Sequence, residues 1–319
     1  MEKTDKIFIA GPKGLVGSAL IRHLTKQGYT NLLTPSHAEL ELLDTHSVST
    51  WFKKNRPDYV FFAAAKVGGI LANNTYPADF IYQNLMIQTN IIHQSYVHKV
   101  KKLLFLGSSC IYPKHCPQPM KEKHLMTGPL EPTNSPYALA KIAGIEMCWS
   151  YNRQYETKFI PVMPTNLYGP NDNFDLETSH VLPALIRKFH EAKINNEKSV
   201  TVWGTGKPTR EFLHVNDLAD ACSFIMKKKF STYDYKNKPL FNIGTGKEIN
   251  IKELAKLIKS IVGFNGNITF DSSKPDGTPL KLLDVTRINL LNWFSTTALK
   301  DGIADTYAFF KEIPTSITA

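Results

Sequence analysis

The stretch at the N-terminus constrains the possible folds most strongly. A short apolar run, Lys6 to Ala10, leads directly into the glycine-rich stretch Gly11 to Gly17, and an amphipathic stretch follows. A strand, a glycine turn and a helix in this order are typical of dinucleotide-binding units. Gly11 permits the tight turn, Gly14 lets the backbone approach a pyrophosphate, and Gly17 lets helix and strand pack closely. The alternative is an ordinary tight turn between a strand and a helix.

Alternating strand and helix patterns continue after this turn. The segment Asp58 to Ala64 is nearly all apolar, as expected of a parallel strand covered on both faces. The alternation predicts an α/β fold: a doubly wound, Rossmann-like parallel sheet with helices on both sides and a smaller C-terminal α/β substrate lobe. Further strands are expected at Asn31 to Thr34, Lys102 to Leu106 and Thr157 to Met163, and helices at Thr45 to Asn55, Ala78 to His98 and Tyr137 to Tyr155.

The pattern loosens from about Asp172 onward, which predicts two domains. At 319 residues the chain exceeds the usual size of one domain. We expect residues 1–171 to form the nucleotide-binding domain, with residues 204–250 partly returning to it through a strand at Pro239 to Ile243. Residues 172–319 are expected to form the substrate lobe, and these boundaries are approximate.

Hydropathy and cysteine spacing exclude several classes of protein. No run approaches about 18 apolar residues, and Met1 to Lys6 is polar and charged. We therefore expect neither a transmembrane helix nor a signal peptide, and a cytoplasmic location. The four cysteines show no CxxC spacing, which argues against a structural metal site and is typical of reduced thiols.

The formal net charge of +10 is compatible with nucleic acid, an anionic surface or an anionic substrate. The lysines and arginines are scattered, and the densest run, Lys227 to Lys229, falls where a helix should end and where cations suit the helix dipole. We therefore expect no nucleic-acid partner and no membrane partner. The surplus is interpreted as partly serving a dianionic pyrophosphate.

Tyr137 and Lys141 are the first candidates for chemistry. They lie four residues apart among good helix formers, so both side chains are expected on one helix face. A cation beside a phenol favours the phenolate and is expected to lower the pKa of Tyr137 from about 10. A hydroxyl from Ser108 or Ser109 would complete a grip on a carbonyl oxygen. This is the chemistry of ketone reduction, although the same spacing also occurs as an ordinary pair on an exposed helix.

The order of the motifs favours the catalytic interpretation, because a glycine turn, a Ser-Ser pair closing a strand, and Tyr and Lys on the next long helix follow one another. In this order, the chain resembles the extended short-chain dehydrogenase/reductases, and within them the GDP-L-fucose synthases, from about Lys6 to about Phe310. The resemblance implies NADP(H), a GDP-sugar substrate, and a homodimer formed through Ala78 to His98 and Tyr137 to Tyr155. It also implies 3,5-epimerisation and 4-reduction of GDP-4-keto-6-deoxy-D-mannose.

The resemblance places a cofactor site at the glycine turn and at the ends of the following strands. The stretch Lys66 to Pro77 is expected as a loop over this site, either closing on the nicotinamide end or acting as a plain connector. The cofactor-binding residues implied are Gly11, Pro12, Lys13, Gly14, Leu15, Val16, Gly17, Leu106, Gly107, Ser108, Ser109, Lys141, Pro164, Thr165, Asn166, Leu167 and His180.

Cys110, two residues past Ser108, and His180 suggest a second reaction. A C–H beside a ketone becomes acidic when the developing enolate is held. Cys110 as thiolate could take the proton, and His180 could return one to the opposite face. The alternatives are a small buried hydrophobe and a helix cap or core hydrogen bond. The resemblance assigns both residues to epimerisation, and the expected catalytic set is Ser108, Cys110, Tyr137, Lys141 and His180.

The same matching places Lys188, Trp203, Arg210 and Asp276 on the nucleotide-sugar. Arg210 can pair with the diphosphate, and Asp276 can accept a hydrogen bond from ribose or base. Trp203 offers apolar and donor contact, and its alternative is a simple core position.

The segment after the second strand bears on the form of the cofactor. It contains Ser36 and His37 and no carboxylate until Glu39, while Lys13 lies inside the glycine turn. An acidic residue there would favour NAD, so its absence favours the 2′-phosphate of NADPH. Related proteins often carry an arginine at this place.

Two alternatives to the main function stay open. The same chemistry could act on another GDP-4-keto sugar, such as a GDP-6-deoxy-heptose or a sugar of the GDP-colitose pathway. A non-catalytic nucleotide-sensing protein could use the same fold, because fold does not fix function. The presence of all five expected catalytic residues argues against this second alternative.

Overall fold

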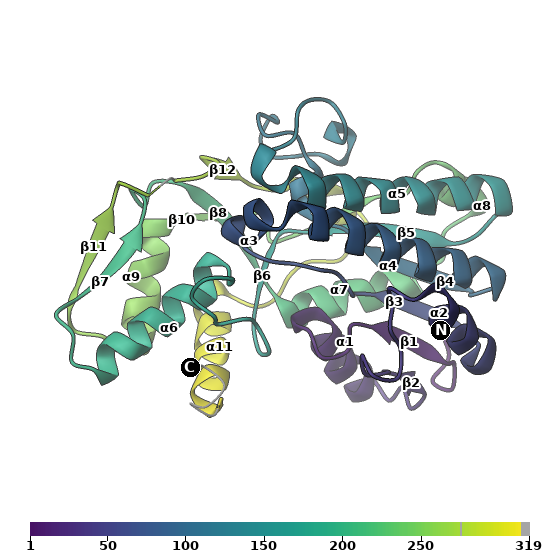
Figure 1. Ribbon diagram of the computed structural model, residues 1–319, viewed down its shortest axis with the longest axis horizontal. Helices are drawn as coiled ribbons and strands as arrows, with labels where there is room; N and C mark the ends of the chain where they lie inside the picture. The colour runs from purple at the N-terminus through teal and green to yellow at the C-terminus, as the bar shows by residue number, and fades with distance from the viewer. Residues whose placement is uncertain (275, 314–319) are drawn as a thin grey trace.

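The larger of the two lobes in Figure 1 is built on six parallel strands in the order β2-β1-β3-β4-β5-β9. The computed structural model describes residues 1–274 and 276–313. The doubly wound α/β fold expected from the sequence is confirmed. The strands are β1 (Ile7–Ala10), β2 (Leu32–Leu33), β3 (Tyr59–Phe62), β4 (Lys102–Leu106), β5 (Phe159–Pro164) and β9 (Phe241–Ile243).

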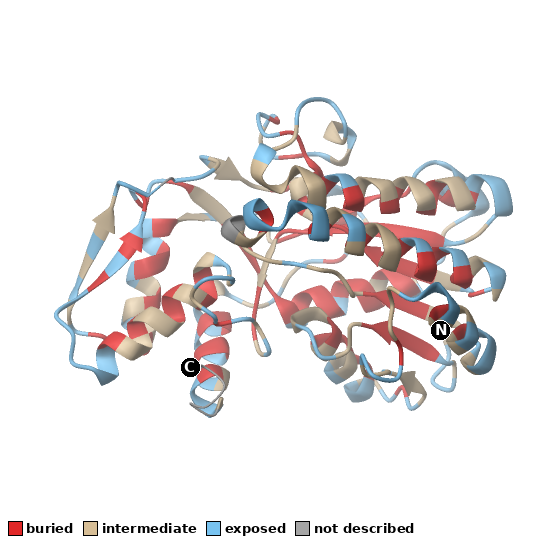
Figure 2. Ribbon diagram, in the orientation of Figure 1, coloured by how far each residue is buried: buried red, intermediate tan, exposed pale blue. Residues whose placement is uncertain are grey.

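Helices cover both faces of this sheet, which explains why its strands are almost wholly apolar. Figure 2 shows the strands as a buried layer, and every residue of β1 and β5 is buried. Two helices cover one face and three cover the other. The first pair is α1 (Leu15–Lys26) and α7 (Val215–Lys227), and the others are α2 (Thr45–Asn55), α4 (Pro77–Val97) and α5 (Ser135–Tyr155).

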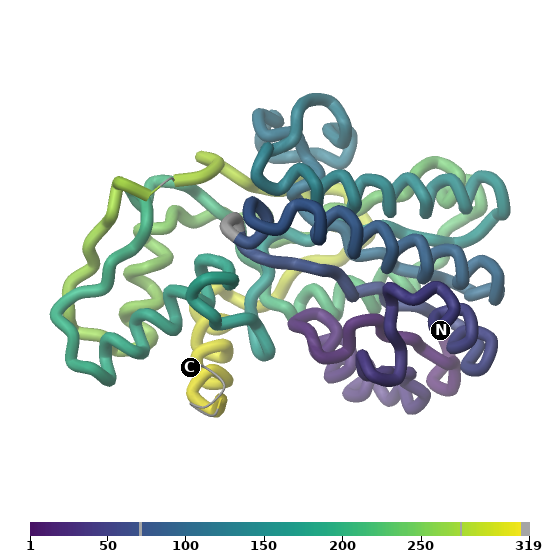
Figure 3. Tube along the Cα trace, in the orientation of Figure 1, coloured from purple at the N-terminus to yellow at the C-terminus, as the bar shows by residue number. Residues whose placement is uncertain are grey.

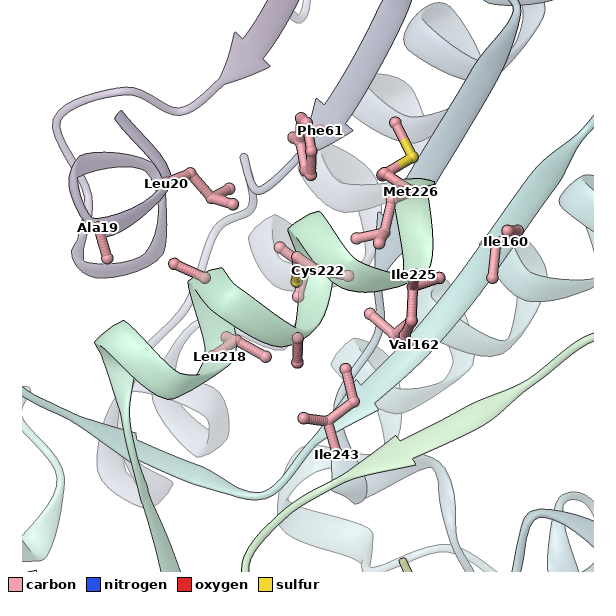
Figure 4. Packing of buried hydrophobic residues seen from close by; sticks show 14 of the residues in the cluster. Ala19, Leu20, Phe61, Ile160, Val162, Leu218, Cys222, Ile225, Met226 and Ile243 are labelled. Atoms are coloured by element: carbon pink, nitrogen blue, oxygen red, sulfur yellow. The ribbon is translucent and has the colours of Figure 1, made fainter. Parts of the chain in front are cut away.

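The helix α7 shows how the core is filled. Figure 4 shows Leu218, Cys222 and Ile225 of this helix among buried side chains of the sheet and of α1. These positions follow the helical spacing that places side chains on one face. The helix ends at Lys227, as the run of three lysines predicted, and the half-buried Lys102 ammonium donates to the carbonyl oxygens of Met226 and Lys228 at this end.

The smaller lobe has its own apolar core between helices and short sheets. Figure 3 shows the chain passing between the lobes more than once, and β9 lies in the large sheet while α9 belongs to the small lobe. The helices of the smaller lobe are α6 (Val181–Ile194), α9 (Ile251–Val262) and α11 (Leu299–Glu312). Strand β6 (Asn166–Tyr168) connects the lobes, and the other strands are β7 (Ser199–Trp203), β8 (Thr209–His214), β10 (Glu248–Asn250), β11 (Asn267–Asp271) and β12 (Leu280–Lys281).

Short helices complete the chain. The stretch that was expected as a loop at 66–77 contains a helix, α3 (Ile70–Thr75), because Gly69 caps its start and Pro77 begins α4. Within the described ranges, no helix is both long and apolar enough to cross a bilayer. The remaining elements are η1 (Ser109–Ile111), η2 (Glu122–His124), η3 (Pro132–Asn134), α8 (Thr232–Lys236) and α10 (Thr286–Asn289).

The strand order fixes where a ligand can bind. From β1 the chain continues to one side of it, at β2, and then to the other side, at β3. Such a reversal opens a crevice outside the carboxyl ends of the strands, where doubly wound folds bind their ligands. The glycine turn after β1 and the Ser-Ser pair after β4 both lie at this edge.

Candidate active site

Ser108 is presented at the carboxyl end of β4. The strand ends at Leu106, and the Ser108 hydroxyl caps η1 by accepting a hydrogen bond from the Cys110 backbone N–H at 3.3 Å. The Ser108 side chain also lies within reach of the Tyr137 hydroxyl, close enough to oppose the rise in the Tyr137 pKa. Ser109 is 7% exposed and lies in η1. Of the two serines considered from the sequence, Ser108 is therefore the one that meets Tyr137.

Tyr137 lies in the first turn of α5, with the edge of its ring against Phe80 at a centroid distance of 6.3 Å. Burial raises the pKa of Tyr137 above its usual value, and the nearby charge of Cys110 raises it further, while the Ser108 hydrogen bond opposes both. The expectation that an adjacent cation would lower this pKa is wrong for this structure. A phenol that keeps its proton is suited to donate it.

Lys141 explains why that expectation failed. Its ammonium donates to the Leu106 carbonyl oxygen at 2.8 Å and lies 5.8 Å from the centre of the Tyr137 ring. The side chain is only 4% exposed, and burial lowers the pKa of Lys141 to about 7. The lysine therefore holds the end of β4 and is itself only partly charged near neutral pH.

Cys110 and His180 lie near one further cation that the sequence analysis did not include. The Lys281 ammonium, on β12, is 4.0 Å from the Cys110 sulfur. His180 occupies the N-cap position of α6, where its side chain makes no capping hydrogen bond. His180 is exposed as a residue, yet the protein crowds its ring enough to lower its pKa, and the charge of Lys281 lowers it further. His180 is therefore mainly neutral at pH 7.

The loop that carries His180 is tied to the stretch over the cofactor site. The Gly69 backbone N–H donates to the Thr178 carbonyl oxygen at 3.0 Å. A β-carbon at Gly69 would lie 3.2 Å from the Ser179 carbonyl oxygen, so only glycine fits this close approach without displacement. The two loops are therefore in direct contact.

The turn after β1 can hold a dinucleotide. Gly11 has φ +81°, and a β-carbon at Gly17 would lie 2.0 Å from the Gly11 carbonyl oxygen, so helix and turn touch through glycine. A β-carbon at Gly14 would meet only the Gly11 carbonyl oxygen, at 3.6 Å. The N-terminus of α1 is therefore open to a pyrophosphate. Pro12, Lys13, Leu15 and Val16 complete this turn and the start of α1.

The other expected cofactor contacts gather at the same sheet edge. Pro164 ends β5, and the Thr165 N–H donates to the Ile243 carbonyl oxygen. The Asn166 amide and the Thr165 hydroxyl both donate to the Glu211 carbonyl oxygen, at 2.8 and 3.3 Å. Leu167 follows on β6 and packs against the core of the larger lobe.

Around the candidate 2′-phosphate contacts, two carboxylates already have partners. Glu39 accepts from the Ser36 N–H and hydroxyl, which lowers its pKa, and Lys13 is near enough to contribute to that lowering. His37 lies 3.2 Å from Glu41. The chain therefore offers Lys13 and His37 at this place, each within reach of a carboxylate.

The expected substrate residues lie together on the smaller lobe. Trp203 ends β7 and is 58% exposed, so it is not a core residue. The ammonium groups of Lys188 and Lys274 lie 5.2 and 5.4 Å from its ring centre. An exposed indole with two cations beside it can contact a flat base and an anionic group.

Asp276 lies at the turn that follows this tryptophan, and Arg210 lies near Asp276. Asp276 accepts from the Thr205 N–H at 2.6 Å and from the Thr205 hydroxyl at 2.7 Å, so it also holds the turn after β7. Burial lowers the pKa of Arg210, and the charge of Asp276 opposes this. Arg210 is paired with Lys281 in the register of β8 and β12. Arg210 thus neighbours Lys281, the cation that contacts Cys110.

Glu211 and Lys281 are the residues that sequence reasoning missed. Lys281 meets Cys110 across 171 positions, and Glu211 binds backbone groups as far as Leu283. No local pattern marks either residue. The only available hint was that Glu211 directly precedes the apolar pair Phe212 and Leu213.

Comparisons with known proteins show which family the chain belongs to. Residues 7–244 match the NAD dependent epimerase/dehydratase family, and the chain belongs to that family. It is 57% identical over 309 residues to GDP-L-fucose synthase 1 of Arabidopsis thaliana, covering 97% of this chain and 94% of that protein. It is 54% identical to GDP-L-fucose synthase of Escherichia coli (strain K12) over 311 residues, covering 97% of each.

A solved structure extends the comparison to the fold. A GDP-D-glycero-L-gluco-heptose synthase from Campylobacter jejuni, determined in the presence of NADPH, is 41% identical to this chain. It superimposes with a TM-score of 0.91 and covers 98% of this chain and 99% of that one.

The burial of Lys141 predicts a pH-dependent penalty on folding. The folded chain releases the Lys141 proton near pH 7, whereas the unfolded chain keeps it to about 10.5. Wild type should therefore gain stability relative to Lys141→Met as pH rises from 7 to 10, by up to about 1.4 kcal/mol per pH unit. Urea unfolding of both proteins across this range measures the difference. A difference that does not change with pH would contradict the assignment.

Proposed function

We propose that the chain is an NADPH-dependent epimerase-reductase that converts GDP-4-keto-6-deoxy-D-mannose to GDP-L-fucose. The observation that carries the proposal is the gathering of Ser108 and Tyr137, as a grip for a ketone oxygen, beside the proton-handling groups Cys110 and His180. A reductase alone needs only the first pair with Lys141. The additional thiol and imidazole are explained by a second, proton-transfer reaction at the same ketone.

The reduction uses the groups around the end of β4. Ser108 and Tyr137 bind the C4 oxygen of the sugar, and NADPH, when bound, supplies the hydride. Tyr137 donates its proton to the oxygen as the negative charge develops. Lys141, fixed to the Leu106 carbonyl, stabilises the tyrosinate that remains. The glycine turn from Gly11 to Gly17 and the N-terminus of α1 hold the pyrophosphate.

The epimerisation uses the same grip on the oxygen. The Cys110 thiolate removes a proton from a carbon beside the ketone, and the electron pair moves toward the C4 oxygen held by Ser108 and Tyr137. His180 returns a proton to the opposite face, and the carbon is inverted. Since the lowered pKa leaves His180 mainly neutral, it must gain its proton before this step. Activity in epimerisation should therefore fall at high pH.

The rest of the cleft supports a GDP-sugar. Trp203 offers a flat contact for the base, and Lys188 and Arg210 suit the diphosphate. Asp276, beside the Thr205 turn, retains lone pairs that can accept from the nucleoside. The second candidate substrate is another GDP-4-keto sugar, because the chain is similar to the heptose synthase of Campylobacter jejuni. The chemistry would be the same. Relative kcat/KM on the two substrates separates these candidates.

The two lobes divide this work. We propose that residues 1–171, with part of 204–250, bind the cofactor, and that residues 172–313 of the described chain mainly hold the GDP-sugar. Trypsin digestion with and without each ligand tests this, and protection that does not follow the division would contradict it.

We propose a cytoplasmic location, because the reaction needs NADPH and a free Cys110 thiol. Fractionation that recovered the protein elsewhere would contradict that location.

Tyr137→Phe removes the proton donor and leaves the glycine turn unchanged. Oxidation of NADPH with GDP-4-keto-6-deoxy-D-mannose should fall by about 100-fold or more, while NADPH binding stays within about twofold of wild type, since no pyrophosphate contact is lost. Tyr233→Phe, which removes the same atom from an exposed residue of α8, is the matched control. A loss of only a few-fold in rate would mean that another group protonates the ketone.

Cys110→Ser separates the two reactions. The variant should lose incorporation of deuterium from deuterated water into the substrate, because serine is a far weaker base than a thiolate at neutral pH. Hydride transfer to the unepimerised ketone should remain. Cys116→Ser, which changes a buried thiol bonded to His124, is the control. Undiminished deuterium at both carbons in the Cys110 variant would assign the base to another residue.

We also propose that the chain forms a homodimer through α4 and α5. These helices pack on the sheet, yet their outer faces expose Tyr82, Val97, Leu139 and Tyr155. A second copy of the same helix pair would cover this surface, since a self-complementary patch suits a two-fold interface. Sedimentation equilibrium should give twice the monomer mass at micromolar concentration, and Tyr82→Glu should weaken the association. A wild-type protein that stays monomeric under these conditions would contradict the proposal.

A further inference from the structure

We infer that Lys281 is a positioning residue for Cys110: its ammonium lies against the sulfur, fixes it toward the sugar and raises its reactivity. The inference rests on the proposed function, which makes Cys110 the base for proton removal. It adds a residue from the far side of the cleft to the proton-transfer machinery. The reaction itself is unchanged.

The geometry places a cation at the sulfur. The Lys281 ammonium lies 4.0 Å from the Cys110 sulfur. A positive charge at this distance favours the charged form of a thiol, and the thiolate is the form that can accept a proton. When the sulfur takes the proton from carbon, the S–H bond forms as the C–H bond breaks, and the electron pair moves to the C4 oxygen. No oxidant or reductant is needed for this step.

The backbone around Lys281 holds it in place. The Leu282 N–H donates to the Gln118 side chain at 3.0 Å, and the Leu283 N–H donates to the Glu211 carboxylate at 2.9 Å. On the other side, the Met120 N–H donates to the Leu282 carbonyl oxygen at 2.8 Å. Pairing of β12 with β8 adds a fourth support. Lys281 is therefore placed by a network of hydrogen bonds on a fixed backbone.

The other titratable groups near the Cys110 sulfur are paired or neutral, so that Lys281 is the cation that acts on it. Lys114 and Glu131 line the same small cleft but neutralise each other in an ion pair of 2.9 Å. Tyr137 faces the sulfur from α5 and is neutral, because its pKa is raised. Among the residues that the structure describes, Lys281 forms no salt bridge with a carboxylate. Its charge is therefore available to the thiolate.

The same ammonium acts on His180. The charge of Lys281 contributes to the lowering of the His180 pKa, after the larger effect of burial. Lys281 therefore lies within electrostatic range of both proton-handling groups, Cys110 and His180.

Alkylation of Cys110 by iodoacetamide in the free protein tests the inference. The rate at pH 7, followed by mass spectrometry of the Cys110 peptide, reports the thiolate. Lys281→Met should slow alkylation roughly tenfold, and Lys281→Arg should restore most of the rate because it restores the charge. Lys252→Met, the same change at an exposed position of α9, should react like wild type. Thermal unfolding and circular dichroism show whether each variant is folded.

Two results would overturn the inference. If folded Lys281→Met is alkylated within twofold of the wild-type rate, the lysine does not hold the thiolate. If, in addition to that unchanged alkylation rate, the KM of Lys281→Met for the GDP-sugar rises, Lys281 contacts the substrate instead of the thiol. The alkylation uses no sugar nucleotide, so its outcome is independent of whether the proposed substrate is correct.

Discussion

The buried carboxylate of Glu211 is the contact on which the geometry of the cleft depends. This side chain, on β8, is 0% exposed. Its carboxylate accepts hydrogen bonds from the backbone N–H groups of Thr245, Gly246 and Leu283, at 2.6, 2.7 and 2.9 Å. Burial raises the pKa of Glu211, and these hydrogen bonds oppose the rise. One residue therefore joins β8 to the turn after β9 and to the segment after β12.

The hydrogen bonds of Glu211 bring the functional groups of both lobes to one edge of the large sheet. On the larger lobe, parallel strands deliver Ser108 and the glycine turn, as doubly wound folds do. On the smaller lobe, β8 and β12 deliver Arg210 and Lys281, in paired register. The Glu211 carbonyl also accepts from Asn166, so the exit of β5 is tied to the same point. A substrate between the lobes therefore meets a grip for its ketone on one side and cations on the other.

Local features of the sequence predicted the larger lobe well. The strand Lys102 to Leu106 and the helix Thr45 to Asn55 were predicted with the bounds that the structure has. Apolar runs and a capping residue, Asp44, whose side chain accepts from the His46 N–H, determine such elements from nearby positions alone. The short strands of the smaller lobe depend on distant partners, and only their region was predicted.

The sequence suggested several members of the candidate site, but it could not show the electrostatics of these residues. Spacing placed Tyr137 and Lys141 on one helix face, but it could not show that the Lys141 ammonium turns toward the Leu106 carbonyl. The pKa of Tyr137 was therefore expected to fall, whereas burial raises it. Lys281 was missed because its contact with Cys110 crosses 171 positions. Desolvation and long-range contacts exist only in the folded chain.

The central claim is that one site both exchanges protons beside a ketone and reduces that ketone. The most direct measurement is one reaction of wild-type protein with GDP-4-keto-6-deoxy-D-mannose and NADPH in deuterated water. Nuclear magnetic resonance of the product should show GDP-L-fucose with deuterium at C3 and C5, formed in step with NADPH oxidation. A reduced product that carries solvent deuterium at neither carbon, or no oxidation of NADPH at all, would contradict the account.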